Sequence, residues 1–403
     1  MQALFTNKVS KLIKISTLIA CTIIVHTPVS AQQIQRIDGS KVSNSTLTAK
    51  IENLMSVANV SGAAVSIFND NKLVYTKTFG YADVSKKTPL TQNSEMYAAS
   101  FAKTIFAYIA SRLLQEKLFE LDTPLVNYLH KDLTDYEIKG WNRGYKDLKK
   151  DNRYKKITAR MCLTHTTGFP NWRWFEADKK LKFKFDPGTR YNYSGEGLYL
   201  LQFVIEQLSG KDYESICQER VFKPLGMKGT SMVWQQNFEN AVCYGHNSGG
   251  KAYDLMRWKE ASCAGSMTTT PADFSKFFEF FISNKGLSKK SFDNMISRHI
   301  GIRSINQFGP LSTVDSTSND SIALGYGLGI GVFKTPFGKA FFKEGHDDGW
   351  GHYSISYPDK KIAMIIMTNN DNGESIFKEL LAYAIGDKFT PWKWENYIPY
   401  NLK

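Results

Sequence analysis

The fold and the function of this chain are best approached from one stretch, Tyr97-Ala98-Ala99-Ser100-Phe101-Ala102-Lys103-Thr104. Apolar residues then recur at positions 102, 105, 106, 109 and 113, a spacing that predicts a buried helix beginning beside Ser100. Lys103 lies three residues after Ser100, so the two side chains share one face of this helix. A lysine with a lowered pKa can take the proton of a serine hydroxyl and make it a nucleophile. Taken alone, the pair could also be an N-cap and a first-turn surface lysine.

Length and composition indicate a globular protein with a large core. The chain has 403 residues, of which 42% are hydrophobic and 13% aromatic, enough for one large or two interleaved domains. The formal net charge is +13, but the lysines are scattered and no nucleic-acid motif is present. We therefore interpret the charge as a solvated surface and expect no nucleic-acid partner.

The first 31 residues have the features of a secretory signal, which are a lysine-containing start, an apolar run from 15 to 25 and a small-residue site, Val29-Ser30-Ala31. We expect an exported protein, periplasmic or secreted, whose mature chain has no transmembrane span. Lipoprotein anchoring at Cys21 is the less favoured alternative, because the apolar run continues past it. Four further cysteines remain, Cys162, Cys217, Cys243 and Cys263, of which the last two could pair after export, although buried thiols are slightly favoured.

Strand-like runs lie near both ends of the chain, and helices fill its middle. The runs are 63–68, 73–81, 327–333, 340–343, 353–357 and 362–367, and short turns between successive late runs require antiparallel pairing. We predict an α/β fold of the α+β type, an antiparallel sheet flanked by helices with a mostly helical insertion. The expected domains are a signal peptide at 1–31, a hydrolase domain at 32–390 and an aromatic tail at 391–403. Within that domain the α/β part covers about 45–118 and 261–390, and the helical part about 119–260.

The order of several motifs resembles the serine β-lactamase and penicillin-binding-protein superfamily, most closely its class C β-lactamase-like branch. That branch also contains D,D-peptidases and esterases. The resemblance covers nearly the whole mature chain and rests on Ser100-Phe101-Ala102-Lys103, Leu163-Thr164-His165-Thr166-Thr167-Gly168, Pro187-Gly188-Thr189-Arg190-Tyr191-Asn192-Tyr193-Ser194, Ala264-Gly265-Ser266-Met267 and Gly345-His346. We interpret His165, at a helix end, as structural rather than as a catalytic base.

The resemblance implies a β-lactamase/transpeptidase-like fold and an acyl-enzyme mechanism without metal or cofactor. Ser100 would attack an amide, peptide, β-lactam or ester carbonyl, with Lys103 and Tyr193 sharing the proton. The family pattern assigns the oxyanion hole to the N–H groups of Ser100 and Gly349. The expected partner is a small-molecule or peptide substrate, including cell-wall peptide, and the expected state is a monomer.

Two positions depart from the family pattern. Gly195 stands where the Tyr-x-Asn motif has Asn or Ser, and Asp348 stands where the late-strand triad has glycine, if that triad is His346-Asp347-Asp348. We prefer this alignment because Gly-His is the usual opening of the triad in the branch. Lys343-Glu344-Gly345 is the alternative. With His346, Asp348 and Gly195 as substrate-binding positions, we expect a poor β-lactamase that prefers a substrate without the usual carboxylate.

Two other classes of function remain open at this stage. One is a non-catalytic penicillin-binding-like or peptidoglycan-binding relative with a degenerate active site. The other is a metal hydrolase that uses His346, Asp347, Asp348 and His352. The neighbouring glycines favour a turn at these residues, and their spacing matches no common metal motif.

Overall fold

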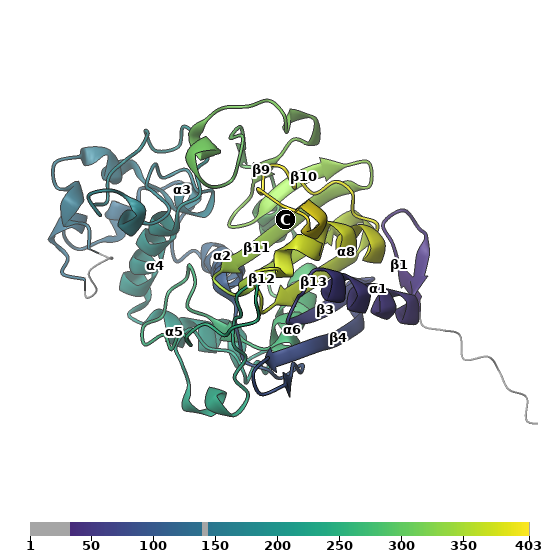
Figure 1. Ribbon diagram of the computed structural model, residues 1–403. Helices are drawn as coiled ribbons and strands as arrows, with labels where there is room; N and C mark the ends of the chain where they lie inside the picture. Colours follow the sequence, from purple (N-terminus) through teal and green to yellow (C-terminus); the bar gives the residue numbers. More distant parts are fainter. Residues whose placement is uncertain (1–32, 139–143, 403) are drawn as a thin grey trace, which may run out of the picture. The chain divides into compact units, whose positions relative to one another are not determined.

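A nine-stranded antiparallel sheet forms the centre of the computed structural model, which describes residues 33–138 and 144–402 (Figure 1). The predicted signal sequence therefore lies outside the described residues. The strands follow the order β5-β4-β3-β13-β12-β11-β10-β9-β8. They comprise β3 (Gly62–Asn69), β4 (Lys72–Asp83), β5 (Thr88–Pro89), β8 (Ile300–Gly301), β9 (Gly325–Tyr326), β10 (Gly331–Thr335), β11 (Gly338–Asp347), β12 (Trp350–Tyr357) and β13 (Ile362–Thr368).

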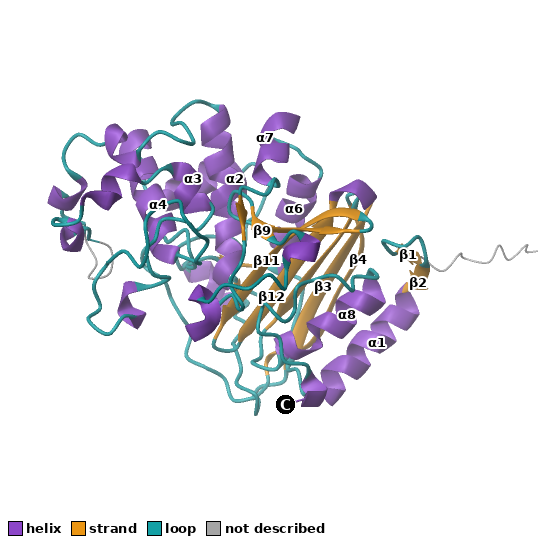
Figure 2. Ribbon diagram, turned by 90° about the horizontal axis from the view of Figure 1, so that it is seen from above, coloured by secondary structure: helices purple, strands orange, loops and turns teal. Residues whose placement is uncertain are grey.

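Helices cover both faces of the sheet. Figure 2 shows α1 (Asn44–Val57) and α8 (Phe377–Ala384) on one face, with α2 (Ala102–Gln115) and α6 (Pro271–Ile282) on the other. Every residue of β13 is buried as a result, which explains why this strand is the most continuously apolar of the chain. The tail packs on the α1 and α8 face, where Trp394 is 1% exposed. The predicted antiparallel sheet is thus confirmed, whereas α1 was missed because its sequence is largely polar.

The remaining regular structure consists of small strands, helices and 3-10 turns separated by loops. The strands β6 (Met96–Tyr97) and β7 (Thr268–Thr269) pair with each other, and β1 (Gln33–Gln35) pairs with β2 (Lys41–Ser43). The helices are α3 (Ala159–Leu163), α4 (Gly195–Ser209), α5 (Tyr213–Cys217) and, after α6, α7 (Lys289–Met295). The four cysteines in the described residues are buried and no disulfide joins them. In the same residues, no helix combines the length and the apolarity needed to cross a membrane.

One end of β11 borders the start of α2. Strand β10 pairs with β11 only as far as Phe342, so the last residues of β11 lack this neighbour. A 3-10 turn, Ala99–Phe101, lies against them instead. A side chain at Gly345 would approach the Ala98 carbonyl oxygen to 3.1 Å and the Phe101 nitrogen to 3.3 Å. The glycine therefore permits the close approach of β11 to the turn that carries Ser100.

Candidate active site

Ser100 and Lys103 meet at the N-terminus of α2. The Lys103 Nζ lies 2.8 Å from the Ser100 Oγ and 2.5 Å from the Ala264 carbonyl oxygen. Lys103 is only 2% exposed, whereas Ser100 is half-buried. Ala99, just before the serine, has φ of 46°, in the left-handed region that a residue with a side chain rarely occupies. A short 3-10 turn thus presents the serine hydroxyl beside a desolvated amine.

Tyr193 joins this pair from the loop that precedes α4. Its ring centre lies 5.3 Å from the Lys103 Nζ and 5.2 Å from the Nζ of Lys343, on β11. The Tyr193 side chain is buried, and its hydroxyl has no hydrogen-bond partner among the described residues. An unsatisfied buried hydroxyl costs stability, so a group of this kind is commonly kept for a bound partner. The structure therefore brings together Ser100, Lys103 and Tyr193, as the sequence predicts.

The two lysines differ in their electrostatic environment. Burial lowers the pKa of Lys103, and the charge of Lys343 adds to this effect, although Tyr193 opposes it. Burial acts on Lys343 in the same direction, but the adjacent Glu344 carboxylate and Tyr193 outweigh it, so the pKa of Lys343 is raised. The Lys343 Nζ donates to Glu344 Oε1 at 2.8 Å. The site therefore holds one amine that loses its proton more readily than an ordinary lysine beside one that holds its proton more tightly.

His165 supports Tyr193 from behind. Its ring stacks on the Tyr193 ring with centres 4.2 Å apart, and its Nδ1 accepts the Ser194 N–H at 3.1 Å. Burial, followed by the charges of Lys103 and Lys343, holds the pKa of His165 well below its usual range. The imidazole is therefore neutral and orients the tyrosine loop, in agreement with a structural role.

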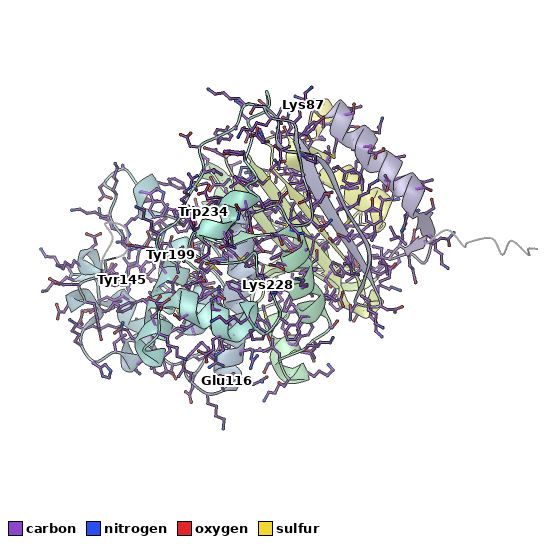
Figure 3. All side chains as sticks on the ribbon, turned by 90° about the horizontal axis from the view of Figure 1, so that it is seen from below. Lys87, Glu116, Tyr145, Tyr199, Lys228 and Trp234 are labelled. Atoms are coloured by element: carbon purple, nitrogen blue, oxygen red, sulfur yellow. The ribbon has the colours of Figure 1, made fainter. Side chains whose placement is uncertain are left out.

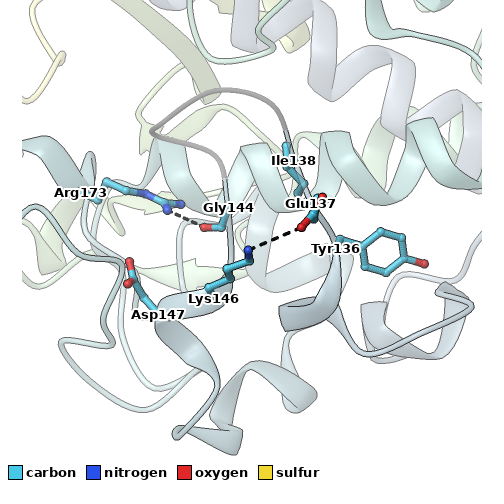
Figure 4. Close-up of a pocket in the computed structure, with 7 residues that line it drawn as sticks. All are labelled: Tyr136, Glu137, Ile138, Gly144, Lys146, Asp147 and Arg173. Atoms are coloured by element: carbon cyan, nitrogen blue, oxygen red, sulfur yellow. Dashed lines mark hydrogen bonds and ion pairs between the residues drawn. The ribbon is translucent and has the colours of Figure 1, made fainter.

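Gly195 makes room for an aromatic side chain. A Cβ at this position would lie 2.2 Å from two carbons of the Trp172 ring, so any larger residue would clash. The same ring lies 5.6 Å from the Lys103 Nζ and covers this side of the site. The next residue, Arg173, holds the Trp172 loop through a buried ion pair with Glu196 on α4. Arg173 also donates to the Gly144 carbonyl at the rim of a separate cavity (Figure 4).

Comparison with known proteins shows the family to which the chain belongs. The beta-lactamase family model matches residues 47–385. The chain belongs to the beta-lactamase family. It is 23% identical to a penicillin-binding protein of Bacillus subtilis, over 77% of this chain and 69% of that protein. It is 24% identical to the lovastatin esterase of Penicillium rubens, over 67% of this chain and 78% of the esterase. Its fold resembles the octameric penicillin-binding protein homologue of Pyrococcus abyssi, with a TM-score of 0.66, 21% identity and coverage of 87% of this chain and 79% of that one.

The geometry of this beta-lactamase family member changes the alignment of the late-strand triad. His346 points away from the site, since its side chain is 64% exposed and its Nδ1 lies 3.5 Å from a Glu374 carboxylate oxygen. Lys343 is the basic residue of β11 that reaches Tyr193, so Lys343-Glu344-Gly345 takes the place of the preferred His346-Asp347-Asp348. The triad glycine is then Gly345, not the position of Asp348. The sequence offered both alignments, and the structure separates them, because residues 343 and 346 lie on opposite faces of β11 and only Lys343 reaches Tyr193.

Gly349 does not present a free N–H to this site. It lies in the turn between β11 and β12, and its N–H donates to Asp371 Oδ1 at 2.7 Å. The expectation that Gly349 completes the oxyanion hole is therefore wrong, because a carboxylate already occupies this donor.

The four residues considered for a metal site, namely His346, Asp347, Asp348 and His352, do not converge on one point. The His352 Nε2 contacts the Tyr97 carbonyl oxygen at 2.8 Å within the protein, while the His346 ring is exposed. Burial lowers the pKa of His352 to about 4. Within residues 33–138 and 144–402, no group of three His, Cys, Asp or Glu side chains is arranged to hold a metal ion.

The contact between Trp172 and Gly195 predicts a coupling between these positions. Gly195→Ala should lower the free energy of unfolding by about 1–3 kcal/mol, because the added methyl group overpacks the tryptophan ring. In a Trp172→Ala background the same change should cost much less, since the ring has been removed. Denaturant unfolding of the two single variants and the double variant measures this difference. Gly249→Ala is the matched control, because its new Cβ would meet no atom closer than 3.5 Å. If Gly195→Ala lowered the free energy of unfolding equally in both backgrounds, the contact with Trp172 would be contradicted.

Proposed function

We propose that this protein is a serine hydrolase that forms an acyl-enzyme through Ser100. The observation that carries the proposal is the 2.8 Å contact between the Ser100 Oγ and a buried lysine of lowered pKa. A half-buried serine at a strained turn, next to such an amine, is arranged for nucleophilic attack rather than for capping. The family match supports a hydrolase, and the geometry supports the assignment of the nucleophile.

In the proposed mechanism, the Ser100 Oγ attacks the substrate carbonyl carbon and its proton passes to the Lys103–Tyr193 pair. The C–O or C–N bond to the leaving group then breaks, and the same proton is delivered to the leaving group. Water hydrolyses the resulting ester, releasing the acid and restoring the serine hydroxyl. Lys343 remains a cation throughout and stabilises negative charge on Tyr193.

The oxyanion of the intermediate would be held by two backbone N–H groups. One is the N–H of Ser100, at the first turn of a helix, where backbone donors have no intrahelical partner. With the triad at Lys343-Glu344-Gly345, the family pattern assigns the other to His346, the residue after the triad. This donor lies on the part of β11 that β10 leaves uncovered. In this proposal His346 acts through its backbone, while its exposed imidazole has no part.

We further propose that the preferred substrate is an ester or amide without a carboxylate near the scissile bond. A cationic lysine at the position of Lys343 could recognise such a carboxylate, but here Glu344 already neutralises it. Gln307 donates to the same Glu344 oxygen at 2.7 Å and fixes the carboxylate in place. On the other side, Trp172 presents an aromatic surface where the family's amide would offer hydrogen bonds. A relative that is named as an esterase agrees with this direction.

Residues 1–31 support export as part of the proposal. The basic start, the apolar run and the small-residue cleavage site would direct the chain out of the cytoplasm. An exported hydrolase of this family would meet its substrate in the periplasm or outside the cell.

Covalent labelling tests the nucleophile. A fluorophosphonate probe should label the protein, and intact mass should show one adduct that is absent in Ser100→Ala, because the Oγ is the attacking atom. Ser111→Ala, which removes a buried serine elsewhere on α2, serves as the control and should label like the parent protein. A protein that is labelled by neither the probe nor an activated ester would instead be the non-catalytic relative.

The pH dependence of kcat/KM tests the roles of the two lysines. Activity should rise with pH as Lys103 loses its proton, and it should level off below the ordinary lysine pKa of 10.5, because the pKa of Lys103 is lowered. Lys343→Met removes a positive neighbour, so it should raise the pKa of Lys103 and move the rise to higher pH. Lys334→Met changes an exposed lysine on the adjoining strand and should leave the profile in place. A profile that is unmoved by Lys343→Met would contradict the coupling.

The ion pair between Lys343 and Glu344 can be tested by a change in specificity. In Glu344→Gln the carboxylate of a bound cephalosporin should replace Glu344 as the counter-charge of Lys343 and raise kcat/KM for this substrate by about tenfold, the size of one charge-assisted contact. The value for p-nitrophenyl acetate, which has no carboxylate, should change by about twofold or less on the same reasoning. Glu52→Gln on α1 is an exposed control. An equal gain in kcat/KM for both substrates would contradict the claim that Glu344 blocks recognition of a substrate carboxylate by Lys343.

A further inference from the structure

A cavity of about 280 Å³ beside the candidate site has an unusual composition. Its walls include four aromatic and four acidic residues and no Lys, Arg or His. They are Tyr97, Trp234, Tyr253 and Trp350, with Glu95, Asp254, Asp347 and Asp348. Trp234, labelled in Figure 3, comes from the segment between α5 and β7, whereas Asp347 ends β11 and Asp348 begins the turn after it. We call this cavity the acidic-aromatic pocket.

The pocket adjoins the proposed catalytic residues through two of its walls. Tyr97 precedes Ser100 by three residues, and its hydroxyl donates to the Gly265 carbonyl at 2.8 Å. The preceding residue, Ala264, accepts the hydrogen bond from Lys103. Asp347 lies beyond Gly345 on β11, whereas Lys343 lies before it. A substrate whose carbonyl meets Ser100 beside Gly345 would therefore reach the pocket on the side away from Lys343.

The carboxyl groups of the pocket lack positive partners. None of the four forms an ion pair within the described residues, and the nearby Arg257 is engaged by Glu239. Glu95 is 7% exposed, and its Oε2 has no hydrogen-bond partner among the described residues. Burial, together with the Asp273 charge, raises the pKa of Glu95 to about 8. Glu95 thus offers a buried acceptor without a partner, and the three aspartates line the same pocket without a positive neighbour among the residues described, an arrangement that a bound cation would compensate.

We propose that the acidic-aromatic pocket binds a primary ammonium group on the acyl part of the substrate, an inference that rests on the proposed hydrolase function. Aromatic faces attract a cation, and carboxyl oxygens accept its three N–H donors. The volume suits one substituent rather than a complete ligand of ordinary size. The favoured substrate is therefore an aminoacyl ester or amide with a free amine, in keeping with the absence of a carboxylate preference at Lys343.

Direct binding tests the pocket without catalysis. In the Ser100→Ala protein, n-butylammonium should bind about tenfold more tightly than n-butanol in a tryptophan-fluorescence titration, because only the first carries a charge. Asp347→Asn and Glu95→Gln should each weaken n-butylammonium by about fivefold. The control Asp293→Asn, which removes an exposed charge on α7, should leave the affinity for n-butylammonium unchanged. Should Glu95→Gln fail to fold, Asp254→Asn at the exposed rim replaces it. Equal binding of the amine and the alcohol would overturn the proposal.

A matched pair of substrates tests the same inference in turnover. Alanine p-nitroanilide and isobutyric acid p-nitroanilide have nearly the same shape, but only the first has an ammonium group. We expect kcat/KM to favour the alanine compound, as either enantiomer, by about tenfold, and Asp347→Asn to remove most of this preference. Equal turnover of the two compounds would overturn the pocket while leaving the hydrolase intact. If the protein binds n-butylammonium but no probe labels Ser100, the ammonium pocket is supported and the proposed hydrolase function is overturned.

Discussion

Two buried lysines approach the ring of one tyrosine, and the rest of the site is arranged around the cost of burying them. An ammonium group without a partner is expensive to bury, so each lysine needs either a counter-charge or a lowered pKa. Lys343 has the Glu344 carboxylate at 2.8 Å and keeps its proton. Lys103 donates instead to the Ala264 carbonyl and the Ser100 hydroxyl, neither of which is a carboxylate, and its pKa falls. The pKa values of the two lysines therefore differ in direction because only Lys343 has a carboxylate beside it.

This arrangement depends on close packing between elements that are far apart in sequence. Strand β11 lies close against the turn of Ser100, and the missing side chain of Gly345 relieves the tight contacts that a Cβ would make there. On the other side of that turn, the ring of Phe101 stacks on Phe274 of α6, with ring centres 4.4 Å apart. The serine is thus held between a helix that covers the sheet and the free end of a strand within it. A shift of α6 or of β11 would therefore change the distance between Ser100 and Lys343 before it changed the distance between Ser100 and Lys103, which are close in sequence.

The local parts of the site could be predicted from the sequence, and the long-range parts could not. The spacing of Ser100 and Lys103 follows from the geometry of one helix, and the strand runs follow from apolar patterning. The choice between Lys343 and His346 required knowing which face of β11 is buried, and the Gly-His dipeptide favoured the wrong one. Strand alternation places Lys343 and His346 on opposite faces of β11, but it does not say which face turns toward Ser100. The contact of Trp172 with Gly195 joins a loop to a helix start, and no local pattern predicts it.

The departures from the family pattern argue against a degenerate site. Random loss of polar groups would leave voids or unpaired buried charges, both of which are destabilising. Here the space beside Gly195 is filled by the Trp172 ring, and the loop of that ring is anchored by the buried pair of Arg173 and Glu196. The charge of Lys343 is likewise matched by a carboxylate that Gln307 holds in place. Each lost interaction with a substrate carboxylate or amide is thus replaced by a specific interaction within the protein, while the serine, lysine and tyrosine stay together. Under the proposed function, such paired substitutions would change which substrate fits the site and leave the serine, lysine and tyrosine that attack it in place.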